Sequence, residues 1–278
     1  MTKTSTDSPA GRRRKLASQI TLLLTTLLLL AWRAQPDGHL HVIFLETKGD
    51  AALIQTPAGG YVLIDGGGDP AALTAALGRR MPFWRRTLDM VVLTSPDSQH
   101  LPGQVAALAR YRAGAALAPP VAKRSATLNE WRRLLDEQGS RFQVARAGDR
   151  LDLGGATLRV LAAGDGDESG LLLRLDYGAT NVVFDHSGGE ADEEALAAIG
   201  PPRATLLAFP WQRDPRAGIV ESLRPRALVF TDGQEADRPA ELTLTTRAIG
   251  GAAVYHERLN GAIEWISDGR RSWIVTER

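Results

Sequence analysis

The chain has 278 residues, of which 44% are hydrophobic and 23% charged, and this composition excludes a disordered or collagen-like protein. The absence of cysteine excludes disulfide frameworks, thiol catalysis, iron–sulfur clusters and cysteine-ligated zinc. The net charge is +1, but residues 1–32 hold five basic residues against one acid, so the remainder is mildly acidic. Any strong contact with nucleic acid must therefore come from a local basic patch.

An apolar segment follows a basic run near the N-terminus. Arg12-Arg13-Arg14-Lys15 stands directly before residues 16–32, which carry no charge. As a helix this segment is about 25 Å long, the short end of a membrane span. Basic residues before a span favour the cytoplasmic side. The sequence therefore predicts a cytoplasmic basic tail (1–15), a single-pass transmembrane signal anchor in the plasma membrane (16–33) and a domain on the extracytoplasmic face (39–278).

Two other interpretations of this segment stay open. A cleaved signal peptide needs small residues at positions −1 and −3 of the cleavage site. Before Gln35 the sequence reads Ala31-Trp32-Arg33-Ala34, which puts a tryptophan at position −3. The third interpretation is a buried helix, which the length of the segment also permits.

From residue 40 onward, short apolar runs alternate with helical patterns, and Asp69-Pro70 and Pro102 mark two helix starts. The expected strands cover 40–46, 51–56, 61–65, 88–94, 150–153, 156–161, 171–177, 181–185, 204–209, 226–231, 252–256, 262–267 and 272–275, and the expected helices 71–79, 101–111, 128–137, 190–199 and 240–249. Strand–helix units come twice, each after a set of hairpins. This order predicts one α/β domain in which two sheets pack together with helices outside.

Several motifs in this domain carry a family resemblance. They are Gly49-Asp50 after the first strand, Ile64-Asp65-Gly66-Gly67, Val91-Val92-Leu93-Thr94, Gly148-Asp149 and Asn260-Gly261. From about Leu40 to the end, the chain resembles a metallo-β-lactamase-fold domain, and more narrowly the C-terminal domain of ComEC-type DNA-internalisation competence proteins. The resemblance implies a four-layer αββα sandwich preceded by one transmembrane helix.

The main metal loop of that family reads His-x-His/Asp-x-Asp-His after a strand that ends in Thr. The matching loop here is Ser95-Pro96-Asp97-Ser98-Gln99-His100, in which only Asp97 and His100 fit the pattern. Ser95 and Gln99 are neutral, weak ligands that replace a histidine and an aspartate. An active relative is a binuclear metal hydrolase, so the resemblance implies that this two-metal site is degenerate.

The later motifs also depart from the family. Its bridging aspartate falls on His186, and an imidazole nitrogen has one lone pair, so it cannot bridge two ions as a carboxylate does. Asp185 stands beside it, but neighbouring strand residues point to opposite faces. Trp211 takes the place of a histidine, and Asp65 is expected to bond loop amides. The predicted pocket therefore comprises Asp65, Ser95, Asp97, Gln99, His100, Asp185, His186 and Trp211.

Within this pocket Asp97, His100 and His186 could hold one zinc or manganese ion, although the main expectation is no cofactor. Ordinary capping, packing or turn roles are the alternative for each of the three. The predicted function is a non-catalytic, membrane-anchored protein, and the alternative is a one-metal phosphodiesterase or nuclease that acts on DNA during uptake. A structural role in a membrane assembly is the third hypothesis. No catalytic residue is assigned.

The expected partners are the membrane and either DNA or a competence-type channel protein. A nucleotide cofactor is not expected, because no P-loop or dinucleotide fingerprint is present. The run Arg79-Arg80-Met81-Pro82-Phe83-Trp84-Arg85-Arg86 interleaves basic and aromatic residues. Such a run could contact nucleic acid or lipid headgroups, but a solvated loop is its more usual structure.

Overall fold

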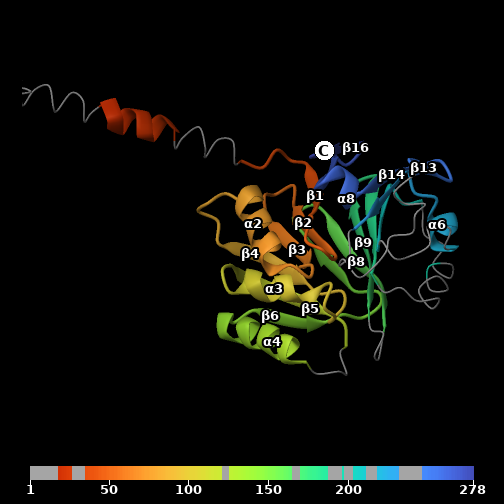
Figure 1. Ribbon diagram of the computed structural model, residues 1–278, viewed down its shortest axis with the longest axis horizontal. Helices are drawn as coiled ribbons and strands as arrows, with labels where there is room; N and C mark the ends of the chain where they lie inside the picture. Colours follow the sequence, from red (N-terminus) through yellow and green to blue (C-terminus); the bar gives the residue numbers. More distant parts are fainter. Residues whose placement is uncertain are drawn as a thin grey trace, which may run out of the picture. The chain divides into compact units, whose positions relative to one another are not determined.

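The structure is a computed structural model of the chain (Figure 1). It describes residues 18–26, 35–120, 125–164, 170–186, 196, 203–210, 218–231 and 246–278. The chain divides into two compact units, Met1–Asp37 and Gly38–Arg278.

In the first unit, residues 18–26 are helical. The hydroxyls of Thr25 and Thr26 donate to carbonyls one turn earlier, at 2.8 Å each. In the described part of the chain, no helix is long and apolar enough to cross a membrane. The predicted basic tail and the remainder of the predicted anchor lie outside the described residues.

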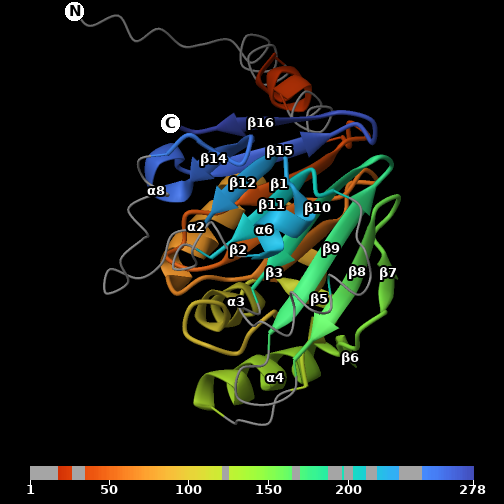
Figure 2. The same cartoon turned by 90° about the vertical axis from the view of Figure 1, so that its right-hand side faces the viewer.

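The second unit is built on two eight-stranded sheets (Figures 1 and 2). The first sheet has the order β16-β15-β1-β2-β3-β4-β5-β6. Its strands are β1 (Leu40–Phe44), β2 (Ala51–Gln55), β3 (Tyr61–Asp65), β4 (Thr87–Val92), β5 (Arg112–Ala118), β6 (Arg141–Val144), β15 (Ile263–Ser267) and β16 (Ser272–Thr276). The hairpins β1–β2–β3 are antiparallel, and β3 to β6 run parallel because helices connect them.

The second sheet has the order β13-β14-β12-β11-β10-β9-β8-β7. Its strands are β7 (Arg150–Asp152), β8 (Thr157–Ala163), β9 (Leu171–Tyr177), β10 (Thr180–Asp185), β11 (Leu206–Phe209), β12 (Ala227–Phe230), β13 (Ala248–Ile249) and β14 (Ala252–His256). This sheet repeats the plan of the first, since β7 to β10 are antiparallel and β10, β11, β12 and β14 are parallel.

The helices cover the outer faces of the two sheets (Figure 1). They are α2 (Pro70–Arg80), α3 (Leu101–Leu108), α4 (Ala126–Gln138), α6 (Gly218–Leu223) and α8 (Glu257–Asn260). Along β1, Val42 faces the apolar layer between the sheets and Ile43 faces the layer under α2, α3 and α4. A third apolar layer joins the second sheet to α6. The predicted four-layer αββα arrangement is confirmed.

Two side chains show how the outer helices are held. At the start of α2, the carboxylate of Asp69 accepts from the amides of Ala71 and Ala72, as expected of an N-cap before proline. On α3, the buried amide of Gln104 donates to the carbonyl of Val92 and accepts from the indole of Trp131 on α4. One side chain therefore ties β4, α3 and α4 together.

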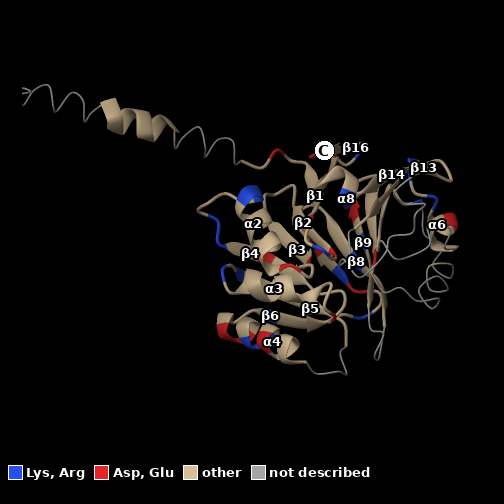
Figure 3. Ribbon diagram, viewed as in Figure 1, with Lys and Arg blue, Asp and Glu red and all other residues tan. Residues whose placement is uncertain are grey.

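The outward face of α4 carries charges of both signs (Figure 3). Arg133 pairs with Glu130 and Glu137 there, whereas Leu128, Trp131 and Leu135 are buried on the other side. The basic and aromatic run after α2 also lies at the surface. Phe83 and Trp84 are exposed, and Arg85 pairs with Asp89 at 3.1 Å.

The sequence prediction missed β5, β6, α6, α8 and β13. The predicted helix 240–249 is wrong at its end, where Ala248–Ile249 pairs with β14, and residues 240–245 lie outside the described part. Of the predicted helix 190–199 only Leu196 is described, and it is helical.

Candidate metal site

Three loops of the first sheet are joined by backbone contacts beside the ends of β3 and β4. The amide of Asp50 donates to the carbonyl of Gln99 at 3.0 Å, and the amide of Gly66 donates to the carbonyl of His100 at 2.7 Å. At Gly103, a Cβ atom would lie 1.8 Å from the Gly66 carbonyl oxygen, so the first turn of α3 fits only without a side chain there. These contacts place Asp50 beside His100.

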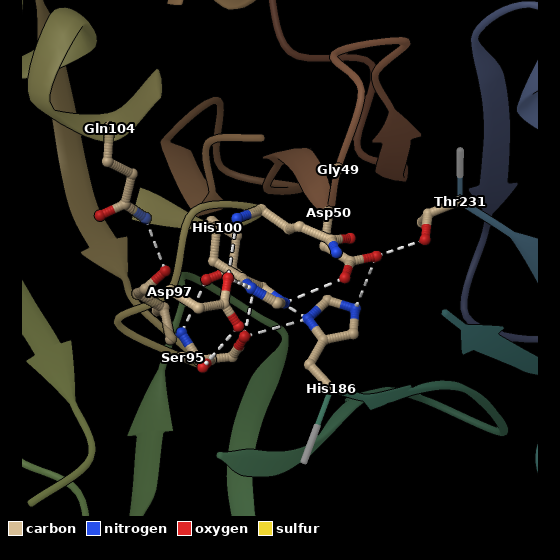
Figure 4. A network of polar contacts seen from close by, with 12 residues as sticks. Gly49, Asp50, Ser95, Asp97, His100, Gln104, His186 and Thr231 are labelled. Carbon is tan, nitrogen blue, oxygen red and sulfur yellow. Dashed lines mark hydrogen bonds and ion pairs between the residues drawn. The ribbon is translucent and has the colours of Figure 1, made fainter. Parts of the chain in front are cut away.

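His100 lies directly before α3 and is 6% exposed. Its Nδ1 is 2.5 Å from Asp97 Oδ1, and its Nε2 is 2.9 Å from Asp50 Oδ2 (Figure 4). Asp97 is fixed in turn by the hydroxyl of Ser95 at 2.9 Å and the amide of Gln99 at 2.8 Å. Asp97 therefore orients the ring so that Nε2 faces Asp50.

His186 follows β10 of the second sheet and approaches the same carboxylate from the other side. Its Nδ1 is 2.8 Å from Asp65 Oδ2, and its Nε2 is 3.8 Å from Asp50 Oδ1. Asp65 is fully buried and also accepts from the amide of Thr94 at 2.7 Å and from its hydroxyl at 2.5 Å. Asp65 therefore orients the His186 ring through Nδ1, as Asp97 orients the His100 ring.

Asp50 is the point on which this network converges. It is 3% exposed, it faces both Nε2 atoms, and the hydroxyl of Thr231, after β12, donates to its Oδ1. One ligand atom each from Asp50, His100 and His186 lies within 4.8 Å of the others. Both Nε2 atoms are buried without a regular hydrogen-bond partner in the described structure, and their nearest polar group is the carboxylate of Asp50, at 2.9 Å from His100 and 3.8 Å from His186.

The buried carboxylates and histidines of the site stabilise each other's charged forms. Burial disfavours the charged form of His100, but the carboxylates of Asp65, Asp50 and Asp97 outweigh it and hold the His100 pKa well above its ordinary value. Burial similarly opposes the charge of His186, and Asp50 and Asp65 nevertheless raise its pKa. Burial acts to raise the pKa of Asp50, yet the two histidines and Thr231 hold that pKa far below its usual range.

The structure brings together some of the predicted site residues and separates others. His100 and His186 lie close together, whereas Asp97 lies on the Nδ1 side of His100, outside the converging group. Ser95 and Gln99 contact Asp97, and Asp185 is buried at the end of β10. Trp211 lies outside the described residues. The expectation for Asp65 is matched by its bond to the Thr94 amide, and its contact with His186 was not foreseen.

Sequence reasoning missed Asp50 as a member of the site. Its Gly-Asp pair was recognised as part of an early loop, but no pattern linked a residue at position 50 to histidines at 100 and 186. The available signal was the carboxylate of Asp50, which follows a glycine turn between two apolar strands. A buried acid in such a place needs a charged or hydrogen-bonding partner.

No family model matches this chain, and no curated protein matches it. Several solved structures are similar to this chain. A diphosphatase from the PhnP family is 16% identical, with a TM-score of 0.50 over 77% of this chain and 95% of that one. A mutant of CmlA β-hydroxylase is 15% identical, with a TM-score of 0.50 over 69% of this chain and 45% of that one. The metallo-β-lactamase-fold protein YhfI from Bacillus subtilis is 15% identical, with a TM-score of 0.46 over 68% and 85%.

The likenesses to the diphosphatase and to the CmlA mutant agree with the two mixed sheets packed face to face between outer helices. The chain has the metallo-β-lactamase fold. At such identities the comparison shows the fold alone, so the site must be judged from its own residues.

The residues of the site fit a metal ion. Protein histidines that bind a metal through one ring nitrogen usually donate the other N–H to a carboxylate, which fixes the tautomer. Both His100 and His186 have this arrangement, with Nδ1 on a carboxylate and Nε2 buried without a hydrogen-bond partner. With Asp50 they form a set of two imidazoles and one carboxylate, which suits zinc and manganese.

Proposed function

We propose that this chain is a membrane-anchored metallo-β-lactamase-fold protein, related to the DNA-uptake competence family, that binds one divalent metal ion and does not carry out two-metal hydrolysis. The observation that carries the metal proposal is the convergence of the two oriented Nε2 atoms on the buried carboxylate of Asp50. Asp50, His100 and His186 would hold the ion, which, when bound, supplies a concentrated positive charge and a Lewis acid at that point.

Two observations favour one ion over two. Two divalent ions close together need a bridging group and several carboxylates, and His186 stands where the resembling family has its bridging aspartate. Ser95 and Gln99 take the places of two further ligands, and both contact Asp97 and so support His100 indirectly. The chain thus keeps the frame of a two-metal site with ligands for one ion.

The same ligands join the two sheets. Asp50 and His100 belong to loops of the first sheet, whereas His186 and Thr231 follow strands of the second. An ion held by these residues would link the halves of the sandwich. This geometry favours a binding or scaffolding role, in which the domain contacts DNA or a channel protein without cleaving a substrate.

A second function is favoured by the number of ligands. Three protein ligands on zinc leave a fourth position for water or substrate, which is the pattern of catalytic rather than structural sites. The alternative proposal is therefore a one-metal phosphodiesterase or nuclease that acts on DNA during uptake.

Metal analysis of the full-length chain tests both. We expect about one equivalent of zinc or manganese per chain, lost in His100→Ala and kept in Glu130→Ala, because Glu130 pairs with Arg133 on the exposed face of α4, away from any group of converging ligands. Hydrolysis of bis-nitrophenyl phosphate and DNA should be undetectable with either metal. Turnover that disappears in His100→Ala would establish the one-metal enzyme instead. Less than a tenth of an equivalent in the natural chain, on the order of what a ligand-free site retains, would refute the metal proposal.

The membrane anchor is a separate proposal. The helical residues 18–26 expose Ile20, Leu22, Leu23 and Leu24 at 51–70% of their surface, and a run of exposed leucines is unfavourable in water. With the basic run before it, the segment suits a span with the domain outside. Protease added to intact cells should therefore cleave beyond Arg33 while leaving a membrane-bound N-terminal fragment. Full protection of the domain would contradict this topology.

A further inference from the structure

A cavity lies at the end of the second sheet that is opposite to the metal site. His186 follows the last residue of β10, whereas the cavity is lined by the first residues of the same strand, Thr180 and Asn181. The length of β10 puts about 17 Å between the two places. The cavity has a volume of about 450 Å³, which is in the range of small-molecule sites.

Arginine dominates the lining of this cavity. Five arginines and one carboxylate line it: Arg174, Arg203, Arg226, Arg270, Arg271 and Asp176. Asp176 is already shared, since it lies 2.7 Å from Nε of Arg174 and 2.9 Å from Nε of Arg159. Among the described residues, no carboxylate forms an ion pair with the exposed side chains of Arg203, Arg226 or Arg270.

Backbone contacts tie parts of the cavity wall together. Two turns, one from each sheet, meet where the amide of Ala179 donates to the carbonyl of Gly269 at 2.7 Å. A Cβ at Gly178 would lie 2.1 Å from that same oxygen, so the turns are packed backbone to backbone. Beside them, Asn181 donates to the carbonyl of Arg203 at 3.1 Å, which fixes the segment before β11. The backbone that carries Arg203, and the turn that carries Arg270 and Arg271, are therefore held in place beside β10.

We propose that this cavity binds a small molecule that carries a diphosphate group. The five arginines of the lining face two carboxylates, Asp176 in the lining and Asp268 in the turn that carries Arg270 and Arg271, so about three positive charges stay unmatched and repel each other unless an anion is present. Guanidinium recognises phosphate oxygens in pairs, through two parallel N–H bonds. Two linked phosphates carry about three negative charges at neutral pH, which matches the cavity better than one phosphate or a carboxylate.

The volume leaves room for an organic group beside the diphosphate, as in a nucleoside diphosphate. The arginines of this site form no contiguous sequence motif. They come from β9, from the segments before β11 and β12, and from the turn before β16. The inference does not depend on the metal site or on the proposed function.

Calorimetric titration of the full-length chain with inorganic pyrophosphate and with ADP tests the proposal, in metal-free buffer with chelator. The test variant combines Arg203→Gln, Arg226→Gln and Arg270→Gln. The control combines Arg79→Gln, Arg110→Gln and Arg146→Gln, three exposed arginines elsewhere, so both variants have the same net charge. We expect the test variant to bind pyrophosphate at least about a hundredfold more weakly, and the control to bind like the natural chain.

Two further arms make the result decisive. His100→Ala should bind pyrophosphate unchanged, and loss of binding there would move the ligand to the metal site. Orthophosphate and sulfate should bind at least about tenfold more weakly than pyrophosphate, and equal affinity would show an unspecific anion patch. A single-stranded oligonucleotide that binds while pyrophosphate and ADP do not would overturn the proposal in favour of nucleic acid. An equal effect of the test and control variants would overturn it as well.

Discussion

Replacing Gly103 by alanine is expected to lower the free energy of unfolding of the domain by roughly 3 kcal/mol or more. Its Cβ would lie 1.8 Å from the carbonyl oxygen of Gly66 and 2.6 Å from the carbonyl carbon, and both atoms are backbone. Backbone at this crossing cannot move aside, since Gly66 also donates to the carbonyl of His100. Either α3 or the turn after β3 must shift, and His100 would move with it.

Gly78 provides the matched control. It lies in α2, and a Cβ there would meet nothing within 4 Å. Gly78→Ala should therefore raise stability by up to about 1 kcal/mol, because alanine is the better helix former. Urea unfolding of the two variants compares the effects directly. If Gly103→Ala were as stable as the natural chain, the close crossing of α3 over the Gly66 turn would be wrong.

Much of the fold could be predicted because many strands and helix starts have a clear signal in the local sequence. The strand β1 is recognisable as a short apolar run, the pattern of a strand whose two faces both lie against apolar layers, as those of Val42 and Ile43 do. So is the start of α2, where Asp69 precedes proline. In contrast β5 reads Arg-Ala-Gly-Ala-Ala-Leu-Ala, which lacks β-branched and aromatic residues, and its place between β4 and β6 decides its conformation.

The candidate site was less predictable for a different reason. The resemblance implies that the loop from Ser95 to His100 is the family's metal loop, in which Asp97 and His100 match the ligand pattern, so Asp97 was predicted as a ligand together with His100. In the structure Asp97 holds the far side of the ring, and the converging carboxylate is Asp50, from a loop fifty residues earlier. Pairings between distant loops follow from sheet order, which a single sequence does not display.

Asp65→Asn is expected to weaken zinc binding about 10–100-fold and to cost about 1–3 kcal/mol of stability. Asparagine has nearly the same shape as aspartate, and it tolerates the left-handed backbone of position 65, where φ is 54°. The substitution therefore changes mainly the charge and the hydrogen bonds. The amide can still accept from the backbone of Thr94, but its NH₂ group would face His186 Nδ1.

An NH₂ group beside Nδ1 favours the tautomer of His186 with its proton on Nε2, the nitrogen that faces Asp50. That proton blocks the lone pair that a metal ion needs. Position 65 is fully buried, so the NH₂ group of the asparagine cannot rotate to form a hydrogen bond with water instead. The loss of affinity should therefore appear together with the loss of stability, measured by chelator competition and by urea unfolding of the metal-free chain.

Asp97→Asn separates the two effects, because Asp97 holds His100 as Asp65 holds His186 but its side chain is 51% exposed. An exposed amide can rotate and present its oxygen to His100 Nδ1, so its hydrogen bond survives without the charge. We expect a loss of zinc affinity of only about threefold, on the order of 0.6 kcal/mol, and little change in the urea midpoint. Equal effects of the two variants would show that burial of the orienting carboxylate does not matter. Natural zinc affinity in Asp65→Asn would show that His186 is not a ligand, which leaves Asp50 and His100 too few to hold the ion.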